Sequence, residues 1–208
     1  MATSSTSICN GALIRIGCAR IAALTDDSDE ARACNELYEQ CRDALFRAHD
    51  WNFGIARAVL TQADTQPLSG FDYQYYLPAD CLYIEDTNIL GDEQTSWRIE
   101  QSVDGRRVLL TDETSVIIRY VTRALDFSQY DALFVDALIA KLAAELAIPL
   151  TGKQSLTATM YQIYESKLLL ATSRNAKETG TVYAHANTTL TRVRVLPRAR
   201  IPGITQET

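Results

Sequence analysis

Few residues of this 208-residue chain have types and spacings that could do chemistry. Cys41 and His49 stand eight positions apart in a stretch that is predicted to be one helix. At about 1.5 Å of rise per residue their backbones would be about 12 Å apart, too far for a thiolate–imidazole pair. The other histidine, His185, lies in a C-terminal stretch that offers nothing to hold a catalytic geometry. A histidine-activated cysteine is therefore not predicted.

Carboxylates are the remaining candidates for acid–base chemistry. The acidic run at residues 26–29 stands at the start of a predicted helix, where it caps exposed N–H groups and complements the helix dipole. A glycosidase pair such as Glu85 and Glu100 stays open, because a sequence does not give the distance between two carboxylates. There is no nucleophile elbow, P-loop or glycine-rich dinucleotide motif. We assign no catalytic residue and expect no enzyme, with a glycan hydrolase as the alternative.

Metal and cofactor sites are not predicted either. The chain has two histidines and five cysteines, with no CxxC pair. Cys34 and Cys41 lie on one face of a predicted helix, where free cysteine behaves as a small apolar residue. All five cysteines are interpreted as reduced thiols of a protein made in a cytosol.

The charge distribution favours a protein partner. Residues 179–208 contain four arginines against Glu207, a net charge of +3, which leaves −9 for the other residues out of a total of −6. Nucleic-acid-binding domains concentrate positive charge on the body instead. We therefore expect the extension to bind an acidic surface on another chain through its arginines. These candidate partner-binding residues are Arg192, Arg194, Arg198 and Arg200.

Other partners are less favoured by the residues. The tyrosines at positions 73, 75 and 76 could stack bases, but no lysine or arginine is interleaved with them. The pair Arg106 and Arg107 is typical of a solvated turn, so a nucleic-acid-binding protein is only a third reading. No stretch reaches 18 uninterrupted apolar residues, and the first residues lack a basic region before their apolar part. Neither a membrane span nor a secretory signal is predicted.

Helices are predicted at both ends of the sequence. The first runs from about Ser5 or Thr6 to Gly17 with Thr6 or Ser7 as its cap, and the second is an acidic-faced helix up to about residue 50. At the C-terminal end of this second helix we expect Trp51 and Phe53 to pack the helix against a sheet, since large aromatic residues dominate core burial. Two more helices follow. Ser128 is the predicted cap of the first of them, and Pro149 and Gly152 end it. The short connection to the second helix makes the two antiparallel neighbours.

The middle of the chain favours β structure. Residues 56–62 are predicted to form a strand, and Pro78 marks an edge strand or a break. Asp104-Gly105 indicates a tight hairpin, and residues 115–125 a buried strand. We expect one small antiparallel sheet of four or five strands. The predicted fold class is α+β. A body of residues 1–178 contains a bundle of about four helices (5–50 and 128–178) with a β-rich insertion at about 52–124. An extended arm follows at 179–208.

Three phrases of the sequence, taken in order, resemble a known family. They are "LYEQCRDALFRAHDWNFGIARAVL" (37–60), "YYLPADCLYI" (75–84) and "VIIRYVTRALDFSQYDALFVDALIAKLAAELAIPLTG" (116–152). Their order and spacing resemble the head-to-tail adaptors of short-tailed bacteriophages, often called tail tubular protein A, over about residues 5 to 178. Gly54 stands where such adaptors more often have alanine, and the arm matches least.

The resemblance implies an assembly role in the virion, at the junction of head and tail. Such adaptors form a ring, commonly of twelve copies, between the portal protein and a tail nozzle protein, and the genomic DNA passes through the ring during ejection without sequence-specific binding. It also implies a C-terminal extension that reaches the portal, which fits the cationic arm. An acidic body suits a channel wall, because a basic lining would hold the moving phosphates.

Overall fold

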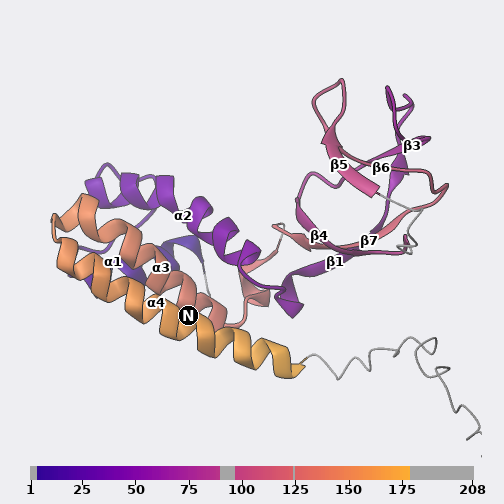
Figure 1. Cartoon of the computed structure of the whole chain (residues 1–208). Coiled ribbons are helices and arrows are strands. Elements are labelled where there is room, and N and C mark those ends of the chain that lie inside the picture. The colour runs from indigo at the N-terminus through magenta and orange to yellow at the C-terminus, as the bar shows by residue number, and fades with distance from the viewer. Residues whose placement is uncertain (1–3, 90–96, 124, 179–208) are drawn as a thin grey trace, which may run out of the picture. The chain divides into compact units, whose positions relative to one another are not determined.

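The computed structural model describes residues 4–89, 97–123 and 125–178, all of which belong to one compact unit, Met1–Glu178. This described part is α+β, as predicted, with four α-helices and two antiparallel sheets (Figure 1). The helices are α1 (Ser5–Ile16), α2 (Asp29–Arg47), α3 (Ala132–Thr151) and α4 (Gln154–Glu178), with 3-10 turns at Asn52–Gly54 and Phe127–Gln129. The predicted arm at 179–208, with its four arginines, lies outside the described residues.

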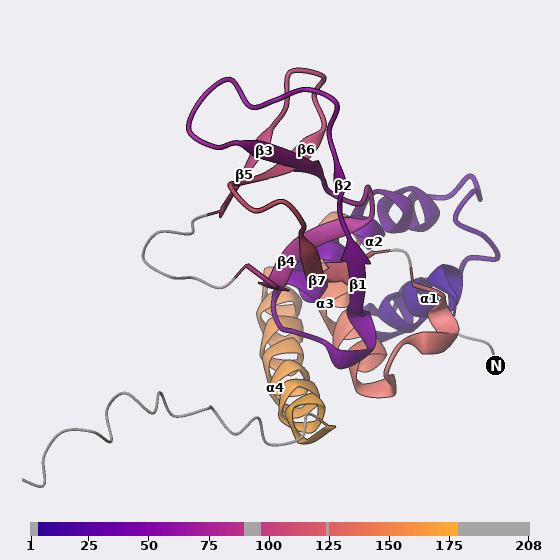
Figure 2. The same ribbon diagram turned by 90° about the vertical axis from the view of Figure 1, so that its right-hand side faces the viewer.

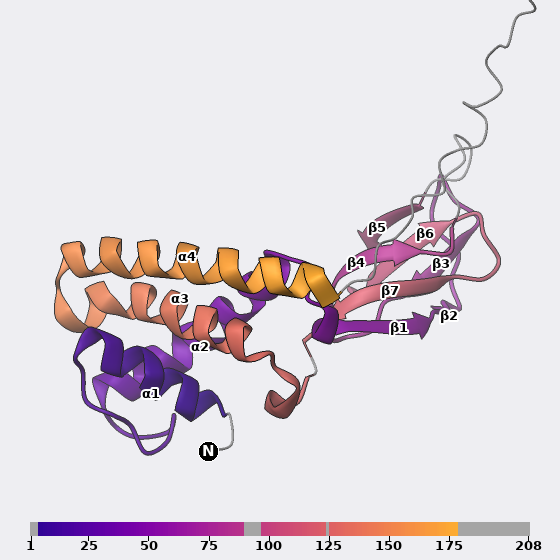
Figure 3. The same cartoon turned by 90° about the horizontal axis from the view of Figure 1, so that it is seen from below.

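Helix α3 is central because apolar residues lie around most of its circumference. It packs against α1, α2 and α4, and Figure 3 shows α4 on one side of it and α1 and α2 on the other. Most of its buried positions are leucine or alanine, which allow close approach of the neighbouring helices. Asp136 on α3 accepts charged hydrogen bonds from Arg15 of α1 and Lys167 of α4, so one carboxylate joins three helices.

Two of the predicted helix ends are wrong. The cap of α1 is Ser4, which forms a reciprocal capping box with Ser7, because the helix already begins at residue 5. Helix α3 is capped by Asp131 and not by Ser128, since the Asp131 carboxylate accepts from the N–H groups of Leu133 and Phe134. Residue 128 lies in the preceding 3-10 turn.

The end of α3 also differs from the prediction. Pro149 lies inside the last turn of α3, and the helix ends at Thr151. A proline this close to the C-terminus removes only one helical hydrogen bond. Gly152, with φ +67°, adopts the left-handed conformation that ends the helix, as expected of a C-terminal glycine.

The β region forms two sheets of the described strands, and the expectation of one sheet with four or five strands is wrong. One sheet has the order β1-β7-β4, and the other the order β2-β3-β6-β5. The strands are β1 (Ile55–Val59), β2 (Thr61–Gln62), β3 (Tyr73–Tyr76), β4 (Cys81–Thr87), β5 (Trp97–Gln101), β6 (Arg107–Thr111) and β7 (Ile117–Thr122). All the pairings are antiparallel.

Two breaks in the chain explain the second sheet. At Leu60, whose N–H donates to the carbonyl of Val116, the chain passes from β1 in one sheet to β2 in the other, so the predicted strand at 56–62 is divided. Pro78 separates β3 from β4 in the same way, and its role as a break is confirmed. The predicted hairpin is confirmed too, with Gly105 at φ +82° between β5 and β6.

A second core lies between the sheets. Figure 2 shows β3, β5 and β6 on one side of this region and β1, β4 and β7 on the other. The alternation of side chains along each strand directs one set inward. The buried side chains of this core are Leu60, Tyr75, Cys81, Ile89, Leu109, Val116, Ile118 and Tyr120.

All five cysteines are free, and four of them are buried. Within the described ranges, none of the helices combines the length and apolar character that crossing a lipid bilayer requires.

Candidate functional site

An aromatic cluster lies where α2 ends and β1 begins. Trp51 is 1% exposed, and its indole N–H donates to the carbonyl oxygen of Leu45 at 2.9 Å. The rings of Trp51 and Phe53 both meet the ring of Phe134 on α3 edge-on, at centroid distances of 5.0 and 5.1 Å. Phe46 of α2 contacts the same ring at 4.8 Å. The aromatic pair is a core element, as predicted, but the rings it contacts belong to the helices and their connections and not to the sheet.

Charged side chains connect α2 to the sheet beside this cluster. The guanidinium of Arg47 donates to the carbonyl of Leu82 on β4 at 2.8 Å and lies over the ring of Tyr83, 5.4 Å from its centroid. Arg123, which follows β7, forms an ion pair with Asp43 of α2 at 3.2 Å. Arginine suits such a position because it hydrogen-bonds and stacks on an aromatic face with the same planar group.

The turn that contains Pro78 is tied to β7 by Asp80. The Asp80 carboxylate accepts from the hydroxyls of Thr122 and Tyr120, and its backbone carbonyl accepts from the N–H of Arg123 at 2.9 Å. The second phrase of the resemblance therefore contacts the third directly. We call residues 43–53, 80–83, 120–123 and 134, together with Asn175, the helix–sheet joint.

Asn175 ties the last turns of α4 to this joint. The side chain is 8% exposed, its Oδ1 accepts from the backbone N–H of Asn52 at 2.9 Å, and its Nδ2 donates to the carbonyl of Asp50 at 2.8 Å. The same Nδ2 lies 3.0 Å from Nε2 of His49, which acts as the acceptor in this arrangement. The side chain of Asn52 donates back to the carbonyl of Asn175 at 2.8 Å.

The titratable groups of the joint serve its structure. The hydroxyl of Tyr83 donates to the Asp50 carboxylate at 2.7 Å. Burial and this carboxylate raise the pKa of Tyr83, so the phenol stays protonated. Just before the joint on α2, burial likewise raises the pKa of the Cys41 thiol to about 11, and this disfavours the thiolate that a nucleophile would need.

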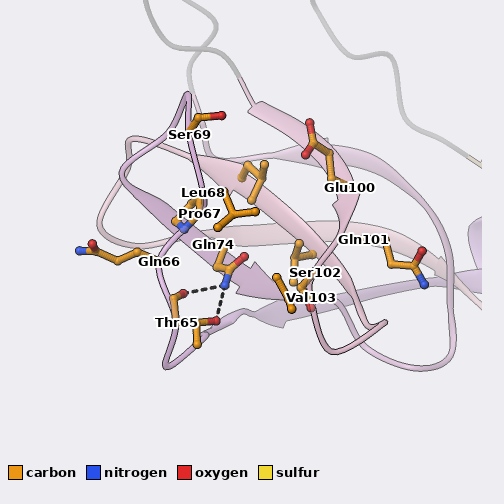
Figure 4. A pocket seen from close by; sticks show the side chains of 12 residues that line it. Thr65, Gln66, Pro67, Leu68, Ser69, Gln74, Glu100, Gln101, Ser102 and Val103 are labelled. Carbon is orange, nitrogen blue, oxygen red and sulfur yellow. Dashed lines mark hydrogen bonds between the residues drawn. The ribbon is translucent and has the colours of Figure 1, made fainter.

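A pocket of about 430 Å³ lies on the outer face of the β2-β3-β6-β5 sheet (Figure 4). Its floor is formed by Val108 and Leu110 of β6, which are 1% and 5% exposed. Its rim is formed by Leu68, in the connection from β2 to β3, and by Val103 in the β5–β6 hairpin, which are 91% and 90% exposed. We call this cavity the loop pocket.

One buried polar side chain faces the loop pocket. Gln74 is 6% exposed, and its Nε2 donates to the carbonyl and the hydroxyl of Thr65 at 2.6 and 2.7 Å. Figure 4 shows these two bonds on one side of Gln74 and its Oε1 turned to the other side. No hydrogen bond to this oxygen exists within the part of the chain that the structure describes. The pocket thus combines apolar walls with an open acceptor.

The two carboxylates of the hydrolase alternative lie in different sheets. Glu85 on β4 forms a two-pronged ion pair with Arg119 of β7 and is committed to that partner. Glu100 on β5 lines the loop pocket and lies 3.7 Å from Arg98. The structure does not bring Glu85 into the pocket that Glu100 lines. Over residues 4–89, 97–123 and 125–178, no cluster of three or more His, Cys, Asp or Glu could hold a metal ion.

The sequence reasoning missed Gln74, Leu68, Val103 and Asn175. An apolar residue inside the turn-like run "DTQPLSG" was a signal for Leu68, since such runs are usually polar. The remaining residues gave no signal, because their roles depend on which strands and helices become neighbours. The predicted arginines Arg192, Arg194, Arg198 and Arg200 lie outside the described residues.

A comparison of the sequence with known proteins found no family model that matches it and no significant similarity to a curated protein.

Proposed function

We propose that this protein is a structural adaptor of a short-tailed bacteriophage virion. Copies of it form a ring, of about twelve subunits by the resemblance, between the portal protein and the tail nozzle protein. The genome passes through this ring during ejection. The role of the protein is then to hold the portal protein and the nozzle protein in place, and not to catalyse a reaction.

The observation that supports this proposal most is the helix–sheet joint. The three phrases that resemble the adaptors are far apart in the sequence, yet residues from all three contact one another at Phe134, Asp80 and Arg123. The phrases therefore describe one structural unit, which is what a shared adaptor fold requires. A joint fastened by rings, ion pairs and buried hydrogen bonds keeps the helices and the sheets in a fixed relation within a ring subunit.

Exposed apolar side chains add independent support. Leu68 and Val103 leave almost all of their surface in water and flank an apolar pocket. Apolar side chains grouped around a concavity are typical of a protein–protein contact. The arginines of the arm, at 192, 194, 198 and 200, are proposed to bind an acidic surface of the portal.

The proposal is tested by mixing the purified protein with the purified portal of the same virion. We expect electron micrographs to show a ring of copies stacked on the portal, and mass measurement to give a fixed ratio of adaptor to portal subunits. A protein that stays monomeric and never joins the portal would refute the proposal.

A truncated protein that ends at Glu178 separates the arm from the body. We expect it to fold, because the described helices and sheets all precede that point, and to lose binding to the portal. A matched full-length variant with all four arginines replaced by glutamine tests whether the charge is the cause. Undiminished binding by both proteins would show that the arm is not the portal contact.

A further inference from the structure

We propose that the loop pocket binds a tryptophan side chain, presented by a cationic loop of a partner protein. The ring system would lie on Val108 and Leu110 between Leu68 and Val103, and its indole N–H would donate to Oε1 of Gln74. This inference names the docking chemistry of one face of the adaptor and so rests on the proposed function.

The apolar part of the pocket selects a large apolar group. The floor residues Val108 and Leu110 are already buried, so the free apolar surface is that of the rim. A volume of about 430 Å³ lies within the range, roughly 300 to 1,000 Å³, of sites that enclose ligand groups. Burying the rim removes the exposed surface of Leu68 and Val103 from water, which is the main gain available to an occupant.

The buried polar side chain of the pocket offers an acceptor, which suits a group that donates. Three side-chain donors on its lining are already used: Nε2 of Gln74 by Thr65, Nε2 of Gln101 by Gly105, and the hydroxyl of Ser102 by Asp104. The acceptor Oε1 of Gln74 is open. An indole carries one N–H donor and no acceptor, so it can satisfy this oxygen and brings no acceptor that would itself need a partner.

The charge around the pocket favours a basic flank on the partner. The sequence has no lysine or arginine between Arg57 and Arg98, so the whole connection from β2 to β3 that covers the pocket lacks a cation. Asp64 and Asp72 lie at its two ends, and Glu100 lines the pocket. Two cations offset these charges in part: Arg98 lies 3.7 Å from Glu100, and Arg106 in the β5–β6 hairpin pairs with Asp104 and interacts with Asp64. A loop with lysine or arginine beside its tryptophan complements this surface.

The experiment uses the full-length protein and four small probes, followed by NMR of the Gln74 side-chain amide and the backbone amides of residues 65, 66, 68, 69, 102 and 103. The probes are N-acetyl-tryptophan amide, its N1-methyl derivative, and the capped peptides Lys-Trp-Lys and Glu-Trp-Glu. We expect the tryptophan amide to shift these signals, and the N1-methyl derivative to bind about fivefold more weakly because one hydrogen bond is lost. Lys-Trp-Lys should bind about threefold more tightly than Glu-Trp-Glu at low salt.

The variant Leu68→Ser/Val103→Ser supplies the specificity control. Both side chains are almost fully exposed, so the replacements leave the fold intact, and they should abolish the shifts. The matched control is Leu169→Ser on α4, 73% exposed, which should leave binding unchanged. Equal binding of the N1-methyl derivative, or shifts that persist in the double variant, would overturn the inference. A ring that forms on the portal while no probe binds would refute this inference alone, whereas binding of the probes by a protein that never joins the portal would refute only the adaptor.

Discussion

The helical core and the β region differ in where their most exposed apolar side chains lie. Around α3 most apolar side chains are enclosed and many have no exposed surface, although Ile148 on α3 and Leu169 on α4 are 51% and 73% exposed. In the β region the inner faces of the sheets are enclosed in the same manner, but the loops place Leu68 and Val103 in water. The difference indicates that apolar residues stabilise the cores, whereas those at the rim of the loop pocket are free for the contact proposed above. Substitutions should therefore separate the two regions by their effect on unfolding.

The largest effect is expected for Trp51→Ala in the helix–sheet joint. The substitution removes a fully buried ring with several aromatic contacts and should lower the free energy of unfolding by about 3–5 kcal/mol. Urea denaturation followed by circular dichroism measures this. Leu169→Ala is the matched control, and a similar loss in both variants would contradict the role of the joint.

A smaller loss is expected for Asn175→Ala. It leaves the N–H of Asn52 and the carbonyl of Asp50 without their buried partner, which costs about 1–3 kcal/mol. Hydrogen exchange should also become faster in the last turns of α4, while the centre of α3 keeps its protection. If the rate of amide hydrogen exchange rises equally in α3 and α4, Asn175 does not stabilise the end of α4 locally.

A pH-dependent effect is expected for Asp136→Asn. Partial burial opposes the charge of Asp136, but hydrogen bonds from Lys167 and Arg15 outweigh it and lower the pKa of this carboxyl. The lowered pKa means that Asp136 stabilises the fold above the unfolded value of about 3.9, and that this contribution is lost as pH falls through the folded value. Wild type should be more stable than the variant at pH 6, and the difference should shrink below pH 4. Unfolding measured at both pH values tests this, and a difference that is constant with pH would contradict it.

The smallest effect is expected for Leu68→Ser and Val103→Ser, each within about 0.5 kcal/mol of wild type. Their side chains are 91% and 90% exposed and contribute little to either core. Thermal denaturation of each single variant measures this. A loss above 1 kcal/mol would mean that the rim of the loop pocket supports the fold, which would weaken its assignment as a contact surface.

Much of the secondary structure could be predicted from local signals. Gly152, Asp104-Gly105 and Pro78 act as expected, because backbone conformation at glycine and proline depends on the residue itself. Helix starts were less predictable at Ser4 and Asp131, since several neighbouring residues could each supply a capping oxygen. The division into two sheets was missed because a strand that changes partner at Leu60 keeps a continuous β-type sequence.

The candidate site was predicted only at its aromatic cluster. Trp51 and Phe53 stand out by size and rarity, and large aromatic residues are usually core residues. Asn175 carries no such signal, because its partners His49, Asp50 and Asn52 lie more than 120 positions away. The arginines of the arm stay a prediction.

The sequence by itself determined the fold class, the turns at glycine and proline, and the apolar character of α3, since each depends on residue type and short-range spacing. Only the tertiary structure decided that Trp51 meets Phe134, that Asp80 meets Thr122, and that Gln74 faces a pocket with an open acceptor. These contacts join segments that are distant along the chain. Their existence depends on the simultaneous packing of both cores, which local preferences do not encode.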